Sequence, residues 1–141
     1  MTNKTNKQLI LTWMRRFYRT SKKANLIMTP HLHQVAIGCM FDLHAEKPSN
    51  NHNTRLQFKQ STIHTEYIVY LFELFRDYCG SPPLYASLYN PKLLKTYTYG
   101  KFNTLSIPCF HFYRSYFYDE NGIKFVPDDI AQHFTSVSLA H

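Results

Sequence analysis

The sequence predicts an α+β domain with an antiparallel sheet, because strand-like and helix-like patterns alternate along the chain. Residues 54–61 (TRLQFKQS) alternate polar and apolar side chains, and residues 95–105 (KTYTYGKFNTL) repeat lysine, tyrosine and asparagine at every second position, which is typical of strands. Residues 64–80 (HTEYIVYLFELFRDYCG) instead repeat apolar residues at helical spacing. The predicted order is two helices, a strand and a probable second strand, a helix, two strands and two further helices, so that helices separate paired strands.

The composition is that of one folded domain with a polyanion as partner. The chain has 141 residues, of which 16% are aromatic, so it holds too much apolar material for a disordered protein. Its formal net charge of +7 favours nucleic acid or an anionic membrane surface. No apolar stretch reaches the roughly 18 residues that a membrane-spanning helix needs, so we expect no membrane insertion. Three widely separated cysteines without a CxxC spacing indicate buried free thiols rather than a disulfide framework or a zinc site.

The N-terminal part is strongly basic and is predicted to lie outside the folded domain. Seven of the 16 lysine and arginine residues precede Asp42, which is the first acidic residue. Residues 8–19 can form an amphipathic helix, and this segment fits a phosphate-binding element, an organelle presequence or simply upstream reading frame. We therefore expect residues 1–29 to be a basic extension and residues 30–141 to form a single domain.

An apolar helix is predicted to lead to the first carboxylate of the chain. Thr29 is a suitable N-cap residue and Pro30 suits the first helical position, so we expect a helix over residues 30–42. Its apolar run over 35–41 ends at Asp42, where polar loop residues begin. A carboxylate in this position is either a solvated helix end or a metal ligand at the end of a packed helix, and the local sequence leaves both open.

The remaining elements follow from turn residues and apolar spacing. The helix within residues 64–80 is predicted to end just before Gly80, which suits the C′ position, because the following double proline cannot continue the helix. Residues 84–89 are predicted to form a strand and 90–94 a turn. The C-terminal part is predicted to hold a short aromatic-rich helix at 108–118, a turn at 119–122 and one or two helical turns at 127–134.

The polar faces of the two alternating strands carry side chains that suit nucleic acid. The first strand places on one face Arg55, Gln57 and Lys59, and the second places on one face Lys95, Tyr97, Tyr99, Lys101 and Asn103. Lysine and arginine reach phosphates or guanine, and glutamine and asparagine can pair with adenine, so a β-ribbon in the DNA major groove is one interpretation. The alternatives are an RNA platform on which Tyr97 and Tyr99 stack, and an ordinary solvated sheet face.

Several segments, taken in order, resemble the LAGLIDADG homing endonucleases of organelle introns, in particular the branch with two motifs in one chain. Residues 44–47 (HAEK), a polar loop and residues 53–61 (NTRLQFKQS) resemble the first motif running into the first strand. Residues 64–83 resemble the middle helix with its double-proline stop, and residues 102–127 resemble the second hairpin with the following helix. Residues 135–141 (TSVSLAH) resemble the lead-in to the second LAGLIDADG helix.

The resemblance implies a fold, a metal and a set of site residues. The fold would be an αββαββα half-domain with an antiparallel saddle sheet that sits in the major groove of double-stranded DNA. Mg²⁺ would be held by the last acidic residue of each motif helix and would support hydrolysis of the phosphodiester bond. By position, Asp42 falls on the metal-binding acid and Gln57 on a catalytic position near it. DNA contacts are expected from Arg55, Gln57, Lys59, Lys95, Tyr97, Tyr99, Lys101 and Asn103.

Two departures from the family pattern shape the remaining expectations. The residue before the metal-binding acid should be small where two motif helices touch, but it is Phe41, and Gly38 does not fall on that position in an ungapped match. The motif is degenerate, and the chain ends where a second motif would begin. We therefore expect either a site-specific DNA endonuclease that dimerises through the helix at 30–42, or a non-catalytic remnant that binds DNA or intron RNA. The resemblance also implies an organelle location, the mitochondrion or alternatively the chloroplast.

Overall fold

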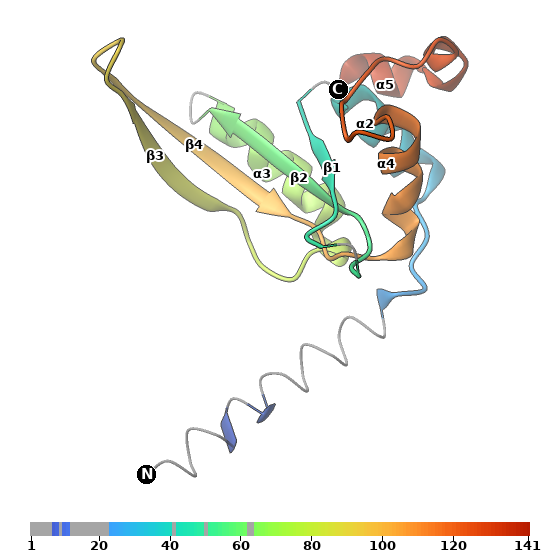
Figure 1. Cartoon of the computed structure of the whole chain (residues 1–141), viewed down its shortest axis with the longest axis horizontal. Coiled ribbons are helices and arrows are strands. Elements are labelled where there is room, and N and C mark those ends of the chain that lie inside the picture. The colour runs from blue at the N-terminus through green and yellow to red at the C-terminus, as the bar shows by residue number, and fades with distance from the viewer. Residues whose placement is uncertain (1–6, 9, 12–22, 41, 50, 62–63) are drawn as a thin grey trace.

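The fold is an antiparallel sheet with one helix packed against one of its faces and a group of helices beside one of its edge strands (Figure 1). The computed structural model describes residues 7–8, 10–11, 23–40, 42–49, 51–61 and 64–141. The predicted helix over residues 8–19 lies largely outside these ranges, and so does Phe41. The described elements are α2 (Pro30–Cys39), β1 (His44–Glu46), β2 (Arg55–Ser61), α3 (Thr65–Phe75), η2 (Arg76–Tyr78), β3 (Leu84–Asn90), β4 (Lys95–Asn103), η3 (Pro108–Phe110), α4 (His111–Phe117), η4 (Ile130–His133) and α5 (Ser136–Ala140).

The four strands form one sheet in the order β1-β2-β4-β3, and every neighbouring pair is antiparallel. The predicted α+β class and the predicted pairing of strands between helices are confirmed. The helix α3 lies against one face of β2 and β4, whereas α2, α4 and α5 gather beside β1 (Figure 1). No helix among the described residues covers the opposite face of β2 and β4.

Aromatic packing holds α3 to the sheet. The rings of Phe58 on β2 and Phe102 on β4 stack with centroids 4.6 Å apart, and Phe75 of α3 lies 4.9 Å from Phe58. Ile68 and Leu71 of α3 are almost completely buried in the same core. Because alternate residues of a strand point to opposite faces, this packing forces the neighbours of Phe58 and Phe102 onto the open face.

The short strand β1 is stabilised by side chains from a distant segment of the sequence. The Ala45 N–H donates to the Tyr118 hydroxyl (3.1 Å), and the Arg114 guanidinium donates to the Ala45 carbonyl (3.1 Å). These two side chains, from α4 and its C-terminal end, satisfy backbone groups at the outer edge of the sheet. An edge strand with its polar groups satisfied in this way does not offer a template for further strand pairing.

The helix α2 is shorter than predicted. The N-cap prediction is confirmed, because Thr29 Oγ1 accepts a hydrogen bond from the Leu32 N–H (3.2 Å) and Pro30 occupies the first turn. The helix ends at Cys39 instead of residue 42. A tight turn follows, in which the N–H groups of Asp42 and Leu43 both donate to the Cys39 carbonyl at 2.9 Å. Asp42 therefore lies in the turn between α2 and β1, where its side chain is exposed.

The helix α3 closes with a tighter turn. The α-helix stops at Phe75 and continues as the 3₁₀ turn η2, whose C-cap is Cys79, so Gly80 follows the cap as predicted. The tighter turn places Tyr78 in the core, where its hydroxyl donates to the Ile27 carbonyl (2.7 Å). Leu26 and Met28 pack against the same core. The described residues immediately before Pro30 thus contact the domain that was predicted to begin there.

The cysteines are free thiols, as the sequence predicts. Cys39 and Cys79 are buried and Cys109 is half-buried, and none of them forms a disulfide. Burial raises the pKa of Cys79 to about 12, which keeps it as a neutral thiol near neutral pH. In the part of the chain that the structure describes, no helix is both long and apolar enough to cross a lipid bilayer.

The short helix α5 packs directly on α2. Gln34 of α2 accepts hydrogen bonds from the side chains of Ser138 (2.5 Å) and Thr135 (3.2 Å). A Cβ atom at Gly38 would overlap the Ser138 carbonyl, so only glycine permits this approach of the two backbones. A homodimer through the helix at 30–42 stays a prediction, and it would have to use the part of α2 that α5 leaves free.

The stability of the protein is expected to depend on pH through His33, which joins α2 to α4. Its Nδ1 lies 2.8 Å from the Tyr113 hydroxyl, and burial, assisted by the charge of His133, lowers the pKa of His33 below its ordinary value of 6.5. The imidazole of His33 therefore binds a proton more readily in the unfolded chain than in the folded one. Its effect on the free energy of unfolding is most favourable above pH 6.5, and the protein loses stability as the pH falls from there through the folded pKa of His33.

We expect the melting temperature to fall between about pH 7.5 and about pH 5.5, and to fall less steeply in His33→Gln, when thermal unfolding is followed by circular dichroism. His31→Gln is the matched control, because His31 is an exposed histidine of the same helix. An identical pH dependence in the wild-type protein and in His33→Gln would contradict this assignment.

Candidate nucleic-acid interface

The register of the sheet brings the predicted DNA-contact residues of two separate strands onto one face. Gln57 of β2 lies opposite Asn103 of β4, and Lys59 lies opposite Lys101. Directly opposed residues of an antiparallel pair share a face, and so do alternate residues along a strand. One face therefore carries Arg55, Gln57, Lys59, Lys95, Tyr97, Tyr99, Lys101 and Asn103. We call this surface the open face.

Three of these side chains already have partners within the protein. Lys59 Nζ lies 4.2 Å from the centroid of the Tyr99 ring, which holds an ammonium group and an aromatic ring together in the middle of the open face. Arg55 forms an ion pair with Glu46 of β1, with its Nε 2.6 Å and its terminal nitrogen 2.5 Å from the same carboxylate oxygen. A phosphate that contacted Arg55 would therefore compete with Glu46, whereas Lys59 remains exposed.

Asn103 lies at the least accessible end of the row. It is half-buried, and its side-chain oxygen is buried without a hydrogen-bond partner among the described residues. Lys95 and Tyr97, at the other end of β4, are exposed. The row is thus half-buried from Asn103 to Tyr99 and exposed at Tyr97 and Lys95.

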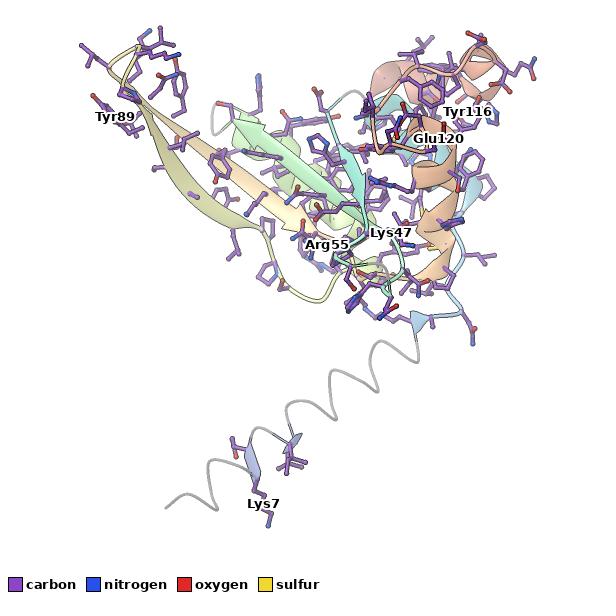
Figure 2. All side chains as sticks on the ribbon, viewed as in Figure 1. Lys7, Lys47, Arg55, Tyr89, Tyr116 and Glu120 are labelled. Atoms are coloured by element: carbon purple, nitrogen blue, oxygen red, sulfur yellow. The ribbon has the colours of Figure 1, made fainter. Side chains whose placement is uncertain are left out.

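The outer half of the β3–β4 hairpin extends beyond α3 as a two-stranded ribbon (Figure 1). Figure 2 shows Tyr89 near its far tip, while Arg55 and Lys47 lie near the opposite end of the sheet. The residues of β3 from Leu84 to Tyr89 are all exposed, so both sides of this ribbon are open. A two-stranded antiparallel ribbon has the dimensions that the DNA major groove accepts.

Asp42 lies at the edge of the same sheet. Asp42 lies two residues before His44, the first residue of β1, whose partner on β2 is Gln57. Asp42, Lys59 and Gln60 line a small cleft together with Cys39 of α2 and Tyr67 of α3. The free volume is about 10 Å³, close to the least that a water molecule needs. Gln57 lies farther along β2, opposite His44, so Lys59 is the open-face residue placed beside Asp42.

Two further side chains near Asp42 were not indicated by the sequence. Lys124 donates to the Leu43 carbonyl (2.6 Å), and its pKa is lowered by burial while the charge of Asp42 acts in the opposite direction. Burial raises the pKa of the Tyr67 hydroxyl, and the nearby Cys39 and Asp42 raise it further. Both residues come from segments distant in sequence, and only the fold brings them to Asp42.

The donor set around Asp42 is incomplete for a divalent metal. Mg²⁺ prefers several oxygen ligands in an octahedral arrangement. Asp42 supplies one exposed carboxylate, and among the described residues no group of three or more His, Cys, Asp or Glu side chains could hold an ion. The described residues around Asp42 therefore do not make up a complete set of metal ligands, and Asp42 alone could supply only one of them.

The fold and the open face define an α+β half-domain of the homing endonuclease class. The family model of the LAGLIDADG DNA endonuclease family matches residues 33–141, and the chain belongs to this family. The chain is also similar to a solved structure of the homing endonuclease I-WcaI bound to its DNA recognition sequence, with 26% sequence identity and a TM-score of 0.73. That match covers 84% of this chain and 52% of the I-WcaI chain, so this chain spans about half the length of that structure.

Proposed function

We propose that the chain is one half of a site-specific DNA endonuclease, and that its open face lies in the major groove of the target. The main support for this proposal is the β2–β4 register, which brings basic, amide and aromatic side chains from separate strands onto the open face. Lysine side chains suit phosphates, and glutamine suits the edge of adenine, so the face can hold the backbone and read bases. The I-WcaI structure supports DNA as the partner, because that protein is bound to its recognition sequence.

We further propose that Asp42 contributes one carboxylate to a divalent metal site shared with a second set of ligands, from another domain or a second copy of the chain. When bound, Mg²⁺ would activate water and neutralise charge at the scissile phosphate. The residues of this chain would position the backbone beside it. Lys59, which lines the same cleft as Asp42, would contact a neighbouring phosphate. Lys124, whose amine donates to the Leu43 carbonyl and interacts electrostatically with Asp42, would limit repulsion between Asp42 and the DNA.

The open face is tested by the salt dependence of DNA binding in lysine variants. Each lost phosphate contact should lower the slope of log Kobs against log salt concentration by about 0.9. We therefore expect Lys59→Gln and Lys101→Gln each to reduce the slope by about that amount, as measured by fluorescence anisotropy with a mixed-sequence duplex between about 50 and about 200 mM salt.

The matched control is Arg76→Gln, which removes a positive charge from η2 at the end of α3, the helix that covers the other face. Its slope should equal that of the wild-type protein. An equal reduction in Arg76→Gln would place the DNA elsewhere, and no binding even at about 50 mM salt would contradict a DNA-binding function.

A further inference from the structure

The open face contains an apolar row that the basic and amide residues do not explain. In the β3–β4 pairing, Leu84 lies opposite Lys101, Ala86 opposite Tyr99 and Leu88 opposite Tyr97. Directly opposed residues share a face, so Leu84, Ala86 and Leu88 project on the same side as the predicted DNA contacts. Leu84 is 64% exposed and Leu88 is 61% exposed.

These leucines do not belong to the hydrophobic core. On the other side of β3, Tyr85 lies towards α3, because a Cβ atom at Gly100 would lie 2.8 Å from the Tyr85 ring and 3.4 Å from Ile68 of α3. Two exposed leucines on an outer strand favour edge-to-edge association unless a ligand covers them. The same face carries Lys59, Lys95 and Lys101, and this charge favours a polyanion as that ligand.

The major groove of DNA offers one apolar group for such a row. Adenine, guanine and cytosine present hydrogen-bond donors and acceptors at their major-groove edges, whereas thymine also presents its C5-methyl group. Leu84 and Leu88 are four residues apart on one strand, which corresponds to about 13 Å. With a rise of about 3.4 Å for each base pair, this distance spans about four base pairs.

We propose that Leu84 and Leu88 read thymine methyl groups at two positions about four base pairs apart, in the part of the target that the β3–β4 hairpin contacts. The inference rests on the proposed DNA-binding function and adds a specificity element to it. The lysines hold the DNA backbone, and the leucines favour thymine because each buries a methyl group that no other base presents.

The test uses the full chain and a duplex target selected by that chain from a randomised library. Each thymine of the selected target is replaced in turn by deoxyuridine, which removes the methyl group and leaves the Watson–Crick edge intact. We expect about fourfold weaker binding at each of two positions about four base pairs apart, and little change at the other thymines. In Leu84→Ala the deoxyuridine effect should vanish at one of these positions, and in Leu88→Ala at the other.

Leu93→Ala is the matched control, since Leu93 is 59% exposed in the turn between β3 and β4 and lies outside the paired rows. It should keep both deoxyuridine effects. A selected target that binds equally well with deoxyuridine throughout would overturn the inference while the proposed function stands. So would deoxyuridine effects that persist in both leucine variants. A failure to bind or select any duplex would overturn the proposed function and this inference together.

Discussion

Replacing Asp42 by Asn is expected to slow Mg²⁺-dependent DNA cleavage severely and to leave DNA binding intact. The substitution keeps the size of the side chain and removes the charge that a hard cation requires. A metal ion contributes several kcal/mol of charge stabilisation to the transition state, so the cleavage rate should fall about 100-fold or more. The measurement follows single-turnover cleavage of a plasmid library with randomised inserts, in Mg²⁺ and in EDTA, beside the affinity for the same DNA.

Binding should not weaken in Asp42→Asn, because an exposed carboxylate repels the phosphate backbone. Asp77→Asn is the matched control: it removes the same charge from η2, at the end of α3, and should keep the wild-type cleavage rate. Undiminished cleavage in Asp42→Asn would exclude Asp42 as a metal ligand. Binding without cleavage by the wild-type protein, over a range of protein and metal concentrations, would support the non-catalytic alternative.

Replacing Gly38 by Ala is expected to destabilise the protein, although alanine is the better helix former. Intrinsic propensity alone predicts a gain of about 1 kcal/mol in an exposed helix interior. At this position the new methyl group would overlap the Ser138 carbonyl and lie 3.1 Å from the Ser138 Cα, and both atoms are backbone. The helices α2 and α5 must therefore separate, and such overpacking typically costs about 1–3 kcal/mol. Urea denaturation followed by fluorescence measures the net change in the free energy of unfolding.

Gly80→Ala provides the control for this prediction. A methyl group there would meet only the Cδ2 atom of Leu105, at 3.2 Å, and this is the end of a flexible side chain. Its effect on the free energy of unfolding should be smaller than that of Gly38→Ala. An unfolding free energy for Gly38→Ala that equals or exceeds the wild-type value would show that α2 and α5 do not touch at this residue.

The open face illustrates which parts of a binding surface can be predicted from sequence. Alternation within β2 and within β4 identified the polar row of each strand, because a period of two is a local property of the chain. Whether the two rows share a face depends on the register between strands that α3 separates in the sequence. The sequence alone does not place Leu84 and Leu88 on the open face, because this placement depends on their pairing with Lys101 and Tyr97.

Around Asp42, too, the sequence predicts the local structure but not the contacts with distant segments. The sequence placed a carboxylate at the end of an apolar helix, and α2 confirms the helix with its Thr29 cap. The predicted helix is three residues longer than α2, because the chain turns tightly after Cys39 to enter β1. The backbone of β1 is hydrogen-bonded by the side chains of Arg114 and Tyr118, which are distant in sequence. Neighbours such as Lys59, Tyr67 and Lys124 come from distant segments, so no local pattern could have gathered them.

The sequence by itself determined the α+β class, most of the helices and strands, the free thiols and the polar rows, since periodicity, capping and composition are encoded locally. The family assignment also rests on the order of segments along the chain, and the match over residues 33–141 confirms it. Only the tertiary structure decided the strand register, the close approach at Gly38 and the residues beside Asp42. These features arise from contacts between segments far apart in the chain, whose geometry is set by the packing of the whole domain.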